Sequence, residues 1–471
     1  MKRAYDRQSG QGVPTAFVTP LQGRGIRAGW TAAVVAILHL CLFGVDISAA
    51  GDKRTLQDCI DTALRNHPSI RAANEAVNAA DAKVSQSASS YFPQVRASTG
   101  YSHNQSTGAI GPTVTKDYTT SLSVNQTLYD FGKTGHALDA TRASRRSLEF
   151  DQERVVQDVI LNVKQSYFAL LAADKLATVS QKSLDKAESH YRQAQAFFRA
   201  GSKPKYDVTR TEVEVNNARL ELINARNNAK IGKITLNNAM GTDPGADISV
   251  EDVLSEPTEV SSLERALTEA LKSKPELLKA DADILAAQER VKAEQSNYLP
   301  SLSASGSYNW SSGTSEGNFL GTDIRQDVGN SWNAGIMLSI PLFEGGLTRG
   351  RVSEARANLL VLEARRESLR QSILLEVNRA FADLESATAR VDVMQTALKK
   401  ASENLDLAQG RYEAGVGPYI EVTDAQVASL KAETDHVQAL YDYQLAAAKL
   451  FRAMGRRSDA VGEKKDESAH R

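Results

Sequence analysis

The chain has 471 residues, in which 56 Lys and Arg nearly balance 57 Asp and Glu. This balance excludes a global field of the kind that attracts nucleic acid. The aromatic content of 6% and the abundance of Ala, Ser and Asn favour helices packed through small side chains over a large globular core. Cys41 and Cys59 are too few for a disulfide framework or a zinc site.

Residues 1–50 are predicted to be an N-terminal extension followed by a secretory signal peptide. Two arginines precede the apolar run "WTAAVVAILHLCLFGV", which is too short to span a membrane comfortably, and small residues follow it up to Ala50. Cleavage there would remove Cys41. Lipid attachment at Cys41 is the alternative, but Leu40 occupies a position where such a signal needs a small residue.

The rest of the chain is predicted to be an internal duplication, with repeats at 51–256 and 257–456 and a charged flexible tail at 457–471. "NHPSIRAANEAV" in the first repeat aligns with "SKPELLKADADI" in the second, and "FRAGSKPKYDV" aligns with "YEAGVGPYIEV" with its glycine and proline in register. Features that recur at a fixed distance indicate repeated architecture.

Each repeat is predicted to contain a pair of strands, at about 93–129 and 300–343. "SLSVNQTL" and "AGIMLSIPL" alternate apolar and polar residues, which suits a strand of about ten residues with lipid on one side and water on the other. An ordinary half-buried soluble strand gives the same pattern. The second repeat carries about seven extra residues, which are expected to form a loop within "SSGTSEGNFLGTDIRQDVGN".

Long helical hairpins are predicted to follow at about 133–240 and 347–455. Neither long helix contains an internal glycine or proline over about 60 residues, so each would be roughly 100 Å long. A seven-residue apolar period along both predicts coiled-coil packing. The seam is expected to include Val163, Leu170, Leu184, Ala194 and Phe198 in the first copy, and Val377, Leu384, Val391, Leu405 and Tyr412 in the second.

Four strands cannot close into a barrel, and open strand edges are not tolerated in hydrocarbon. Since the smallest membrane barrels have eight strands, other copies of the chain would have to complete one. The fold class predicted is therefore mainly α with a membrane β-barrel that continues into a long periplasmic helical coiled coil.

The double repeat, the Tyr-x-Pro before each strand pair, "LYDFGK", "LFEGGL" and "YEAGVGPYIEVTDAQ" together resemble the TolC-type outer-membrane efflux proteins. The resemblance implies a homotrimer with a twelve-stranded barrel in outer-membrane lipid of a Gram-negative bacterium and a helical tunnel in the periplasm. It implies an exit duct of a tripartite efflux pump or a type I secretion system. The implied partners are a periplasmic adaptor and an inner-membrane RND-type or ABC transporter.

The acidic residues Glu421 and Asp424 are the first site candidates. They lie three apart and would share a face of a helix that begins near Pro418. Acids are also favoured at helix N-termini by the dipole and by capping, so the spacing alone leaves a structural role open. The resemblance implies that they form carboxylate rings at the periplasmic constriction of the tunnel.

The resemblance also implies a latch that holds the tunnel closed, for which Tyr412 and Asp207 match the family's partners. Gly417 stands where the best-known latch has an arginine, and Tyr412 fits equally a residue of the coiled-coil seam. The turn residues are expected to be turn-formers first and, by analogy with the family, the tips that meet the adaptor: Gly201, Pro204, Gly415, Gly417 and Pro418.

Enzyme and cofactor signals are weak. "FGKT" at residues 131–134 resembles the end of a phosphate-binding loop, but the upstream glycine is missing and the second repeat lacks the lysine. No catalytic, metal or cofactor site is predicted. The alternative function is a periplasmic adaptor, which would carry one hairpin rather than two; a purely structural coiled-coil scaffold would not explain the strands.

Overall fold

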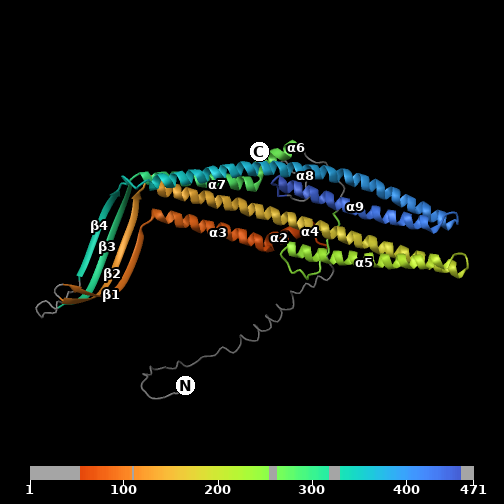
Figure 1. Ribbon diagram of the computed structural model, residues 1–471, viewed down its shortest axis with the longest axis horizontal. Coiled ribbons are helices and arrows are strands. Elements are labelled where there is room, and N and C mark those ends of the chain that lie inside the picture. Colours follow the sequence, from red (N-terminus) through yellow and green to blue (C-terminus); the bar gives the residue numbers. More distant parts are fainter. Residues whose placement is uncertain (1–52, 109–110, 254–261, 318–328, 458–471) are drawn as a thin grey trace, which may run out of the picture. The chain divides into compact units, whose positions relative to one another are not determined.

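The computed structural model describes residues 53–108, 111–253, 262–317 and 329–457. The predicted signal peptide, Cys41 and nearly all of the predicted tail lie outside the described residues. From Lys53 onward the described residues belong to one compact unit, so the two predicted repeats pack together rather than forming separate bodies. Figure 1 shows the helices of this unit lying side by side.

The first repeat begins with two short helices, and the second of them starts with Pro68 at its first turn, where a missing N–H costs nothing. A short 3₁₀ turn then leads into two strands and two long helices. The bounds are α2 Leu56–Asn66, α3 Pro68–Ala88, β1 Gln94–Gly108, β2 Gly111–Tyr129, α4 Lys133–Arg199 and α5 Lys205–Ala239.

The second repeat has the same order of elements, and Pro275 again opens its second helix. Its long helix contains 67 residues, as does α4 in the first repeat. The bounds are α6 Leu263–Ser273, α7 Pro275–Gln295, β3 Ser301–Gly317, β4 Gly329–Ser339, α8 Leu347–Glu413 and α9 Tyr419–Ala453. The two hairpins α4–α5 and α8–α9 thus have closely matching lengths.

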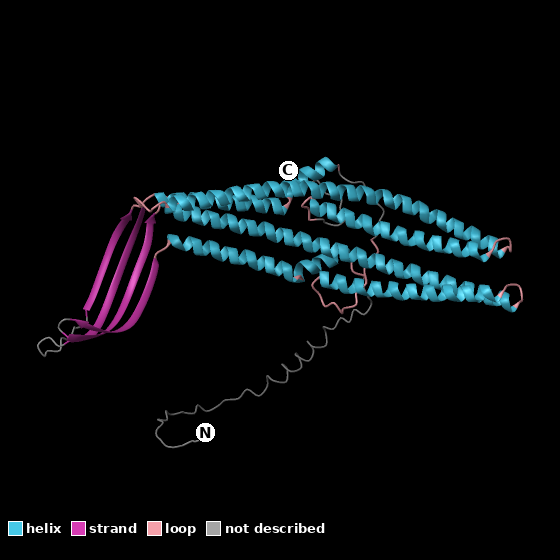
Figure 2. Ribbon diagram, viewed as in Figure 1, coloured by secondary structure: helices cyan, strands magenta, loops and turns pink. Residues whose placement is uncertain are grey.

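The described strands form one antiparallel sheet in the order β1-β2-β3-β4, drawn in magenta in Figure 2. Its two faces differ in chemistry because side chains alternate along each strand. One row across all four strands consists of apolar residues: Ala97, Leu122, Tyr308 and Trp332. The next row on the opposite face is polar throughout: Ser98, Ser121, Asn309 and Ser331.

Three of the four strands are longer than the predicted length of about ten residues. β1, β2 and β3 contain 15, 19 and 17 residues, because Ser, Thr and Asn residues continue the backbone ladder beyond the apolar segment. Both ends of the predicted loop "SSGTSEGNFLGTDIRQDVGN" are therefore strand, at the end of β3 and the start of β4. The centre of this loop lies outside the described residues. β4 ends at Ser339, two residues before Pro341, which has no N–H to donate to a ladder.

The junction between sheet and helix is built by the same device in both repeats. Gly132 and Gly346 adopt left-handed φ angles of 89°, which favour glycine. Asp130 then accepts a hydrogen bond from the backbone N–H of Thr134 at 2.9 Å, while in the second repeat Glu344 bonds the Thr348 hydroxyl. The segment "FGKT" is therefore part of a helix-capping turn.

The helices pack mainly as α4 with α5, α8 with α9, and α4 with α7 and α3, while α9 also packs against α4. Most predicted seam residues are buried, including Leu170 and Val377. Phe198 is a wrong prediction, since its side chain is 44% exposed and the neighbouring Phe197 packs into the core instead. Within the described ranges, no helix is both long enough and apolar enough to cross a bilayer.

Candidate functional site at the hairpin tips

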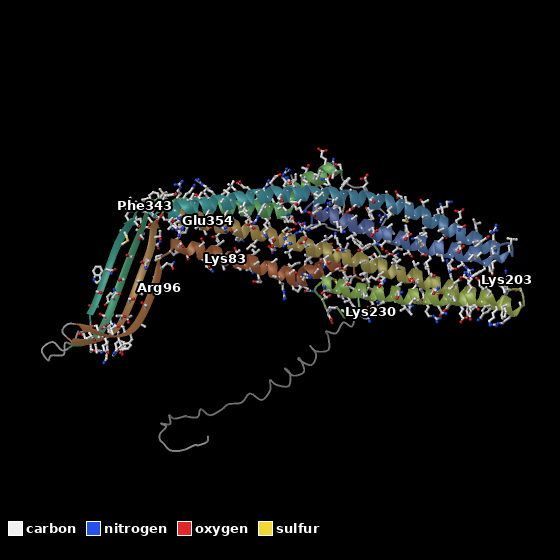
Figure 3. All side chains as sticks on the ribbon, in the orientation of Figure 1. Lys83, Arg96, Lys203, Lys230, Phe343 and Glu354 are labelled. Atoms are coloured by element: carbon white, nitrogen blue, oxygen red, sulfur yellow. The ribbon has the colours of Figure 1, made fainter. Side chains whose placement is uncertain are left out.

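Both hairpin tips are closed by the same backbone turn. Gly201 and Gly415 adopt φ angles of 72° and 75°, and the N–H of the next residue bonds back to a carbonyl five residues earlier, at 3.0 Å in each tip. This is a Schellman ending, which satisfies the last carbonyls of a helix. Pro204 and Pro418 then lie at the N-caps of the returning helices. Lys203, labelled in Figure 3, lies in the first of these turns.

Gly417 is held in a narrow space in the second turn. A Cβ at this position would lie 3.2 Å from the Cβ of Arg411 and 3.2 Å from Glu421 Oε2. Arg411 itself forms an ion pair with Glu421, with Nε 3.2 Å from Oε2. The chain therefore has an arginine at this tip, but it comes from the end of α8 and pairs within its own hairpin.

The two acids Glu421 and Asp424 lie in the first turns of α9, as their spacing predicted. Asp424 is exposed, whereas Glu421 is partly covered by Arg411. A carboxylate beside a guanidinium is already neutralised in part. The two acids are therefore not equivalent: Asp424 is exposed and unpaired as far as the described residues go, and Glu421 is one half of an ion pair.

Tyr412 packs against the tip of the first hairpin. Its ring contacts the Phe197 ring at a centroid distance of 6.5 Å, and the Lys203 ammonium lies 5.2 Å from its centroid. Burial, assisted by the charge of Asp207, raises the pKa of the Tyr412 hydroxyl. Among the described residues, however, no hydrogen bond joins Tyr412 to Asp207, so this pair interacts only at longer electrostatic range.

Tyr419 makes the direct polar contact between the hairpins. Its hydroxyl donates to Glu214 Oε2 of α5 at 2.9 Å, and Thr423 of α9 donates to Oε1 of the same carboxylate at 3.3 Å. The centroid of the Tyr419 ring lies 5.3 Å from that of Tyr412 and 6.1 Å from that of His190 of α4. Burial and the neighbouring Glu214 carboxylate raise the pKa of the Tyr419 hydroxyl, which keeps it a donor.

Arg411, Tyr419, Glu214 and His190 were not among the residues singled out from the sequence. Arg411 could have been found, since it lies ten positions before Glu421, across a turn that the glycines and the proline mark. The Tyr419 contact joins residues 205 positions apart, and nothing in the local pattern indicates it. In the described part of the chain no cluster of His, Cys, Asp and Glu is arranged to bind a metal ion.

Comparison with solved structures identifies the class of protein that this fold defines. The outer membrane channel CmeC of Campylobacter jejuni superimposes with a TM-score of 0.72 at 19% sequence identity, over 85% of this chain and 85% of that chain. This likeness shows that the chain has the same fold as that outer membrane channel. A two-faced sheet joined to paired long helices is thus a known channel architecture.

Sequence comparison then places the chain in a family. The family model of outer membrane efflux proteins matches residues 59–242 and 266–456, and the chain belongs to that family. Protein CyaE of Bordetella pertussis is 27% identical over 406 residues, covering 86% of this chain and 84% of that protein. The outer membrane protein TolC of Escherichia coli is 22% identical over 430 residues, covering 89% and 85%.

Family membership confirms the predicted fold class, the outer-membrane location and the role as an exit duct for efflux or type I secretion. It decides against the two alternatives, a periplasmic adaptor and a structural scaffold. Members of the family are channels rather than enzymes, which is consistent with the non-enzymatic role expected from the sequence.

Proposed function

We propose that three copies of the chain assemble into a passive duct whose sheets join into one twelve-stranded barrel. The open sheet carries this proposal: β1 and β4 are its two edges, and neither has a second partner strand among the described residues. Unpaired backbone groups are too costly in hydrocarbon, so each edge needs the edge of another copy. The exposed apolar face, which includes Trp332 and Ile336, would face lipid.

The hairpin tips form the periplasmic gate of this duct. Glu421 and Asp424 of each copy would line the constriction as rings of carboxylates, which attract cations and repel anions. Contacts of Tyr412 with the first hairpin support a closed arrangement, since they join the two hairpins within each chain. The low exposure of Tyr412 agrees with this role.

The turns themselves would contact a periplasmic adaptor, which links the duct to an inner-membrane RND-type or ABC transporter. Gly201, Pro204, Gly415, Gly417 and Pro418 shape these turns. Each tip presents an exposed apolar side chain, Phe198 on the first and Val416 on the second, and exposed apolar side chains at a turn suit a protein interface.

The number of copies is tested by the mass of the detergent-solubilised complex. We expect three copies of the processed chain, an outer-membrane fraction, and a gel band that dissociates only on heating. A two-copy complex would also close a barrel, of about eight strands, and would overturn the trimer. Ion conductance of the purified complex in planar bilayers tests the duct separately.

A further inference from the structure

Glu214 is placed to join the two hairpins near their tips. It lies on α5 of the first hairpin, yet both of its carboxylate oxygens accept hydrogen bonds from α9 of the second, one from Tyr419 and one from Thr423. The Nε atom of Arg210, one turn earlier on α5, lies 3.5 Å from Oε1 of Glu214. Separating the hairpins would therefore break two hydrogen bonds to one charged acceptor.

The environment of Tyr419 strengthens this contact. Its side chain is only 8% exposed and belongs to a small core at the tip that also contains Tyr412 and Val422. A hydrogen bond to a charged group in such a site is stronger than one in water, and breaking it leaves a buried hydroxyl without a partner. The ring of His190 of α4 also makes an edge contact with the Tyr419 ring.

The alternative contact, between Tyr412 and Asp207, lacks this geometry. Tyr412 is held by the Phe197 ring and the Lys203 ammonium, and it has no hydrogen bond to Asp207 among the described residues. Arg411, the arginine nearest the turn, pairs with Glu421 of its own hairpin. Neither contact ties a buried donor of one hairpin to a charged acceptor of the other.

We propose that the bond between Tyr419 and Glu214 is the main latch that holds the first hairpin against the second in the closed tip. The proposal rests on the gate described under the proposed function. Tyr412 then supplies packing, and Thr423 helps to position the Glu214 carboxylate. Opening the tip requires the Tyr419 hydroxyl to leave Glu214 and be solvated by water.

The test measures the separation of the hairpins directly. Spin labels at Ser202 and Val416, one in each turn, are introduced with Cys59→Ser, and labelled chains are diluted with unlabelled chains so that distances within one chain dominate. Tyr419→Phe removes only the hydroxyl, and Glu214→Gln removes only the charge. We expect both to broaden the distance distribution and to lower the closed-to-open ratio, by about tenfold or more for Tyr419→Phe.

Two comparison variants sharpen the result. Tyr206→Phe removes a hydroxyl from an exposed tyrosine at the tip of the first hairpin and should leave the distribution unchanged. The double variant Tyr419→Phe with Glu214→Gln should loosen the tip by less than the sum of the two single effects, since both changes act on the bond between Tyr419 and Glu214. Assembly of every variant is checked by the heat-dependent gel band, and Glu214→Gln alone carries the test if Tyr419→Phe fails to assemble.

Three outcomes would overturn the latch. The first is a distance distribution in Tyr419→Phe and in Glu214→Gln that matches the parent. The second is a tip that loosens in Tyr412→Phe but not in Tyr419→Phe or Glu214→Gln. The third is a double variant in which the two single effects add. Bilayer conductance is recorded in parallel, with a higher open fraction expected for Tyr419→Phe. Failure of the parent complex to conduct would instead contradict the proposed function, while the label distances would still report on the latch.

Discussion

At the scale of single residues, Arg411 changes the electrostatics expected from the acids at the tip. Its guanidinium lies beside Glu421, while Asp424 is exposed and forms no ion pair within the described part of the chain. A ring built from these residues would attract cations mainly through Asp424, because the charge of Glu421 is partly balanced. The spacing of the acids predicted their common location but not this difference.

Arg411→Ala should therefore increase the block of the channel by divalent cations, because it releases the charge of Glu421. Asp424→Ala should weaken the block more than Glu421→Ala does. The measurement is single-channel conductance in planar bilayers against increasing divalent concentration, with Lys431→Ala as a control that breaks an exposed ion pair farther along α9. Equal effects of the two acid substitutions would contradict the role of Arg411.

The candidate site was only partly predictable for a physical reason. Glu421, Asp424 and the turn glycines are read from local rules of helix caps and turns, which act over a few residues. The contact of Tyr419 with Glu214 depends on how two long helical hairpins lie against each other. That arrangement follows from packing along their whole length, and no short segment encodes it.

At the scale of elements, the sheet is defined by the difference between its faces. Trp332 on the apolar face is 76% exposed, and its neighbour Asn333 points to the polar face. The alternation predicted the strands and their faces from the sequence. It did not predict the strand lengths, because polar residues that extend a ladder carry no distinguishing period.

A lysine on each face gives a matched test of this element. Trp332→Lys should destabilise the assembled barrel by up to about 2–4 kcal/mol, depending on its depth in the bilayer, because it places a charge against lipid. Asn333→Lys, one residue away, should have little effect because its face is polar. The measurement is denaturant unfolding in lipid vesicles, and a similar loss for both variants would exclude a lipid-facing role of the Trp332 face.

At the scale of the whole molecule, Arg452 ties the two repeats together near their middle. It lies on α9, and its guanidinium bonds Asp158 of α4 at 2.8 Å and Glu276 of α7 at 2.5 Å. Burial alone would raise the pKa of Glu276, but the hydrogen bond and charge of Arg452 outweigh it and hold that pKa below its usual value. The duplication was readable in the sequence, whereas this link between its halves was not.

Arg452→Met should destabilise the protein by about 3 kcal/mol at neutral pH, because it leaves Glu276 partly buried without its partner. Because the pKa of Glu276 is lowered in the folded chain, this stabilisation is present above the ordinary glutamate pKa of about 4.5 and is lost as the pH falls through the folded pKa. The difference in stability between Arg452→Met and the parent should therefore become smaller at acidic pH. Thermal unfolding of both proteins at several pH values measures this difference.

Arg390→Met is the control for this experiment. Arg390 pairs with Asp442 within the second hairpin and is exposed, so its loss should cost less than about 1 kcal/mol. If Arg452→Met lowers the stability by the same amount at every pH, packing of the Arg452 side chain rather than its ion pair with Glu276 stabilises the protein here.

The bond between Tyr419 and Glu214 also makes the duplicated halves unequal. Under the repeat alignment Tyr419 corresponds to Lys205 and Glu214 to Ala428, so the reverse bond lacks its acceptor. In a closed ring of alternating hairpins, this bond would secure the boundary within each chain and be absent from the boundary between chains. The ring would then have two kinds of seam, so opening would begin at the subunit boundaries and be complete only when the bond within each chain also breaks.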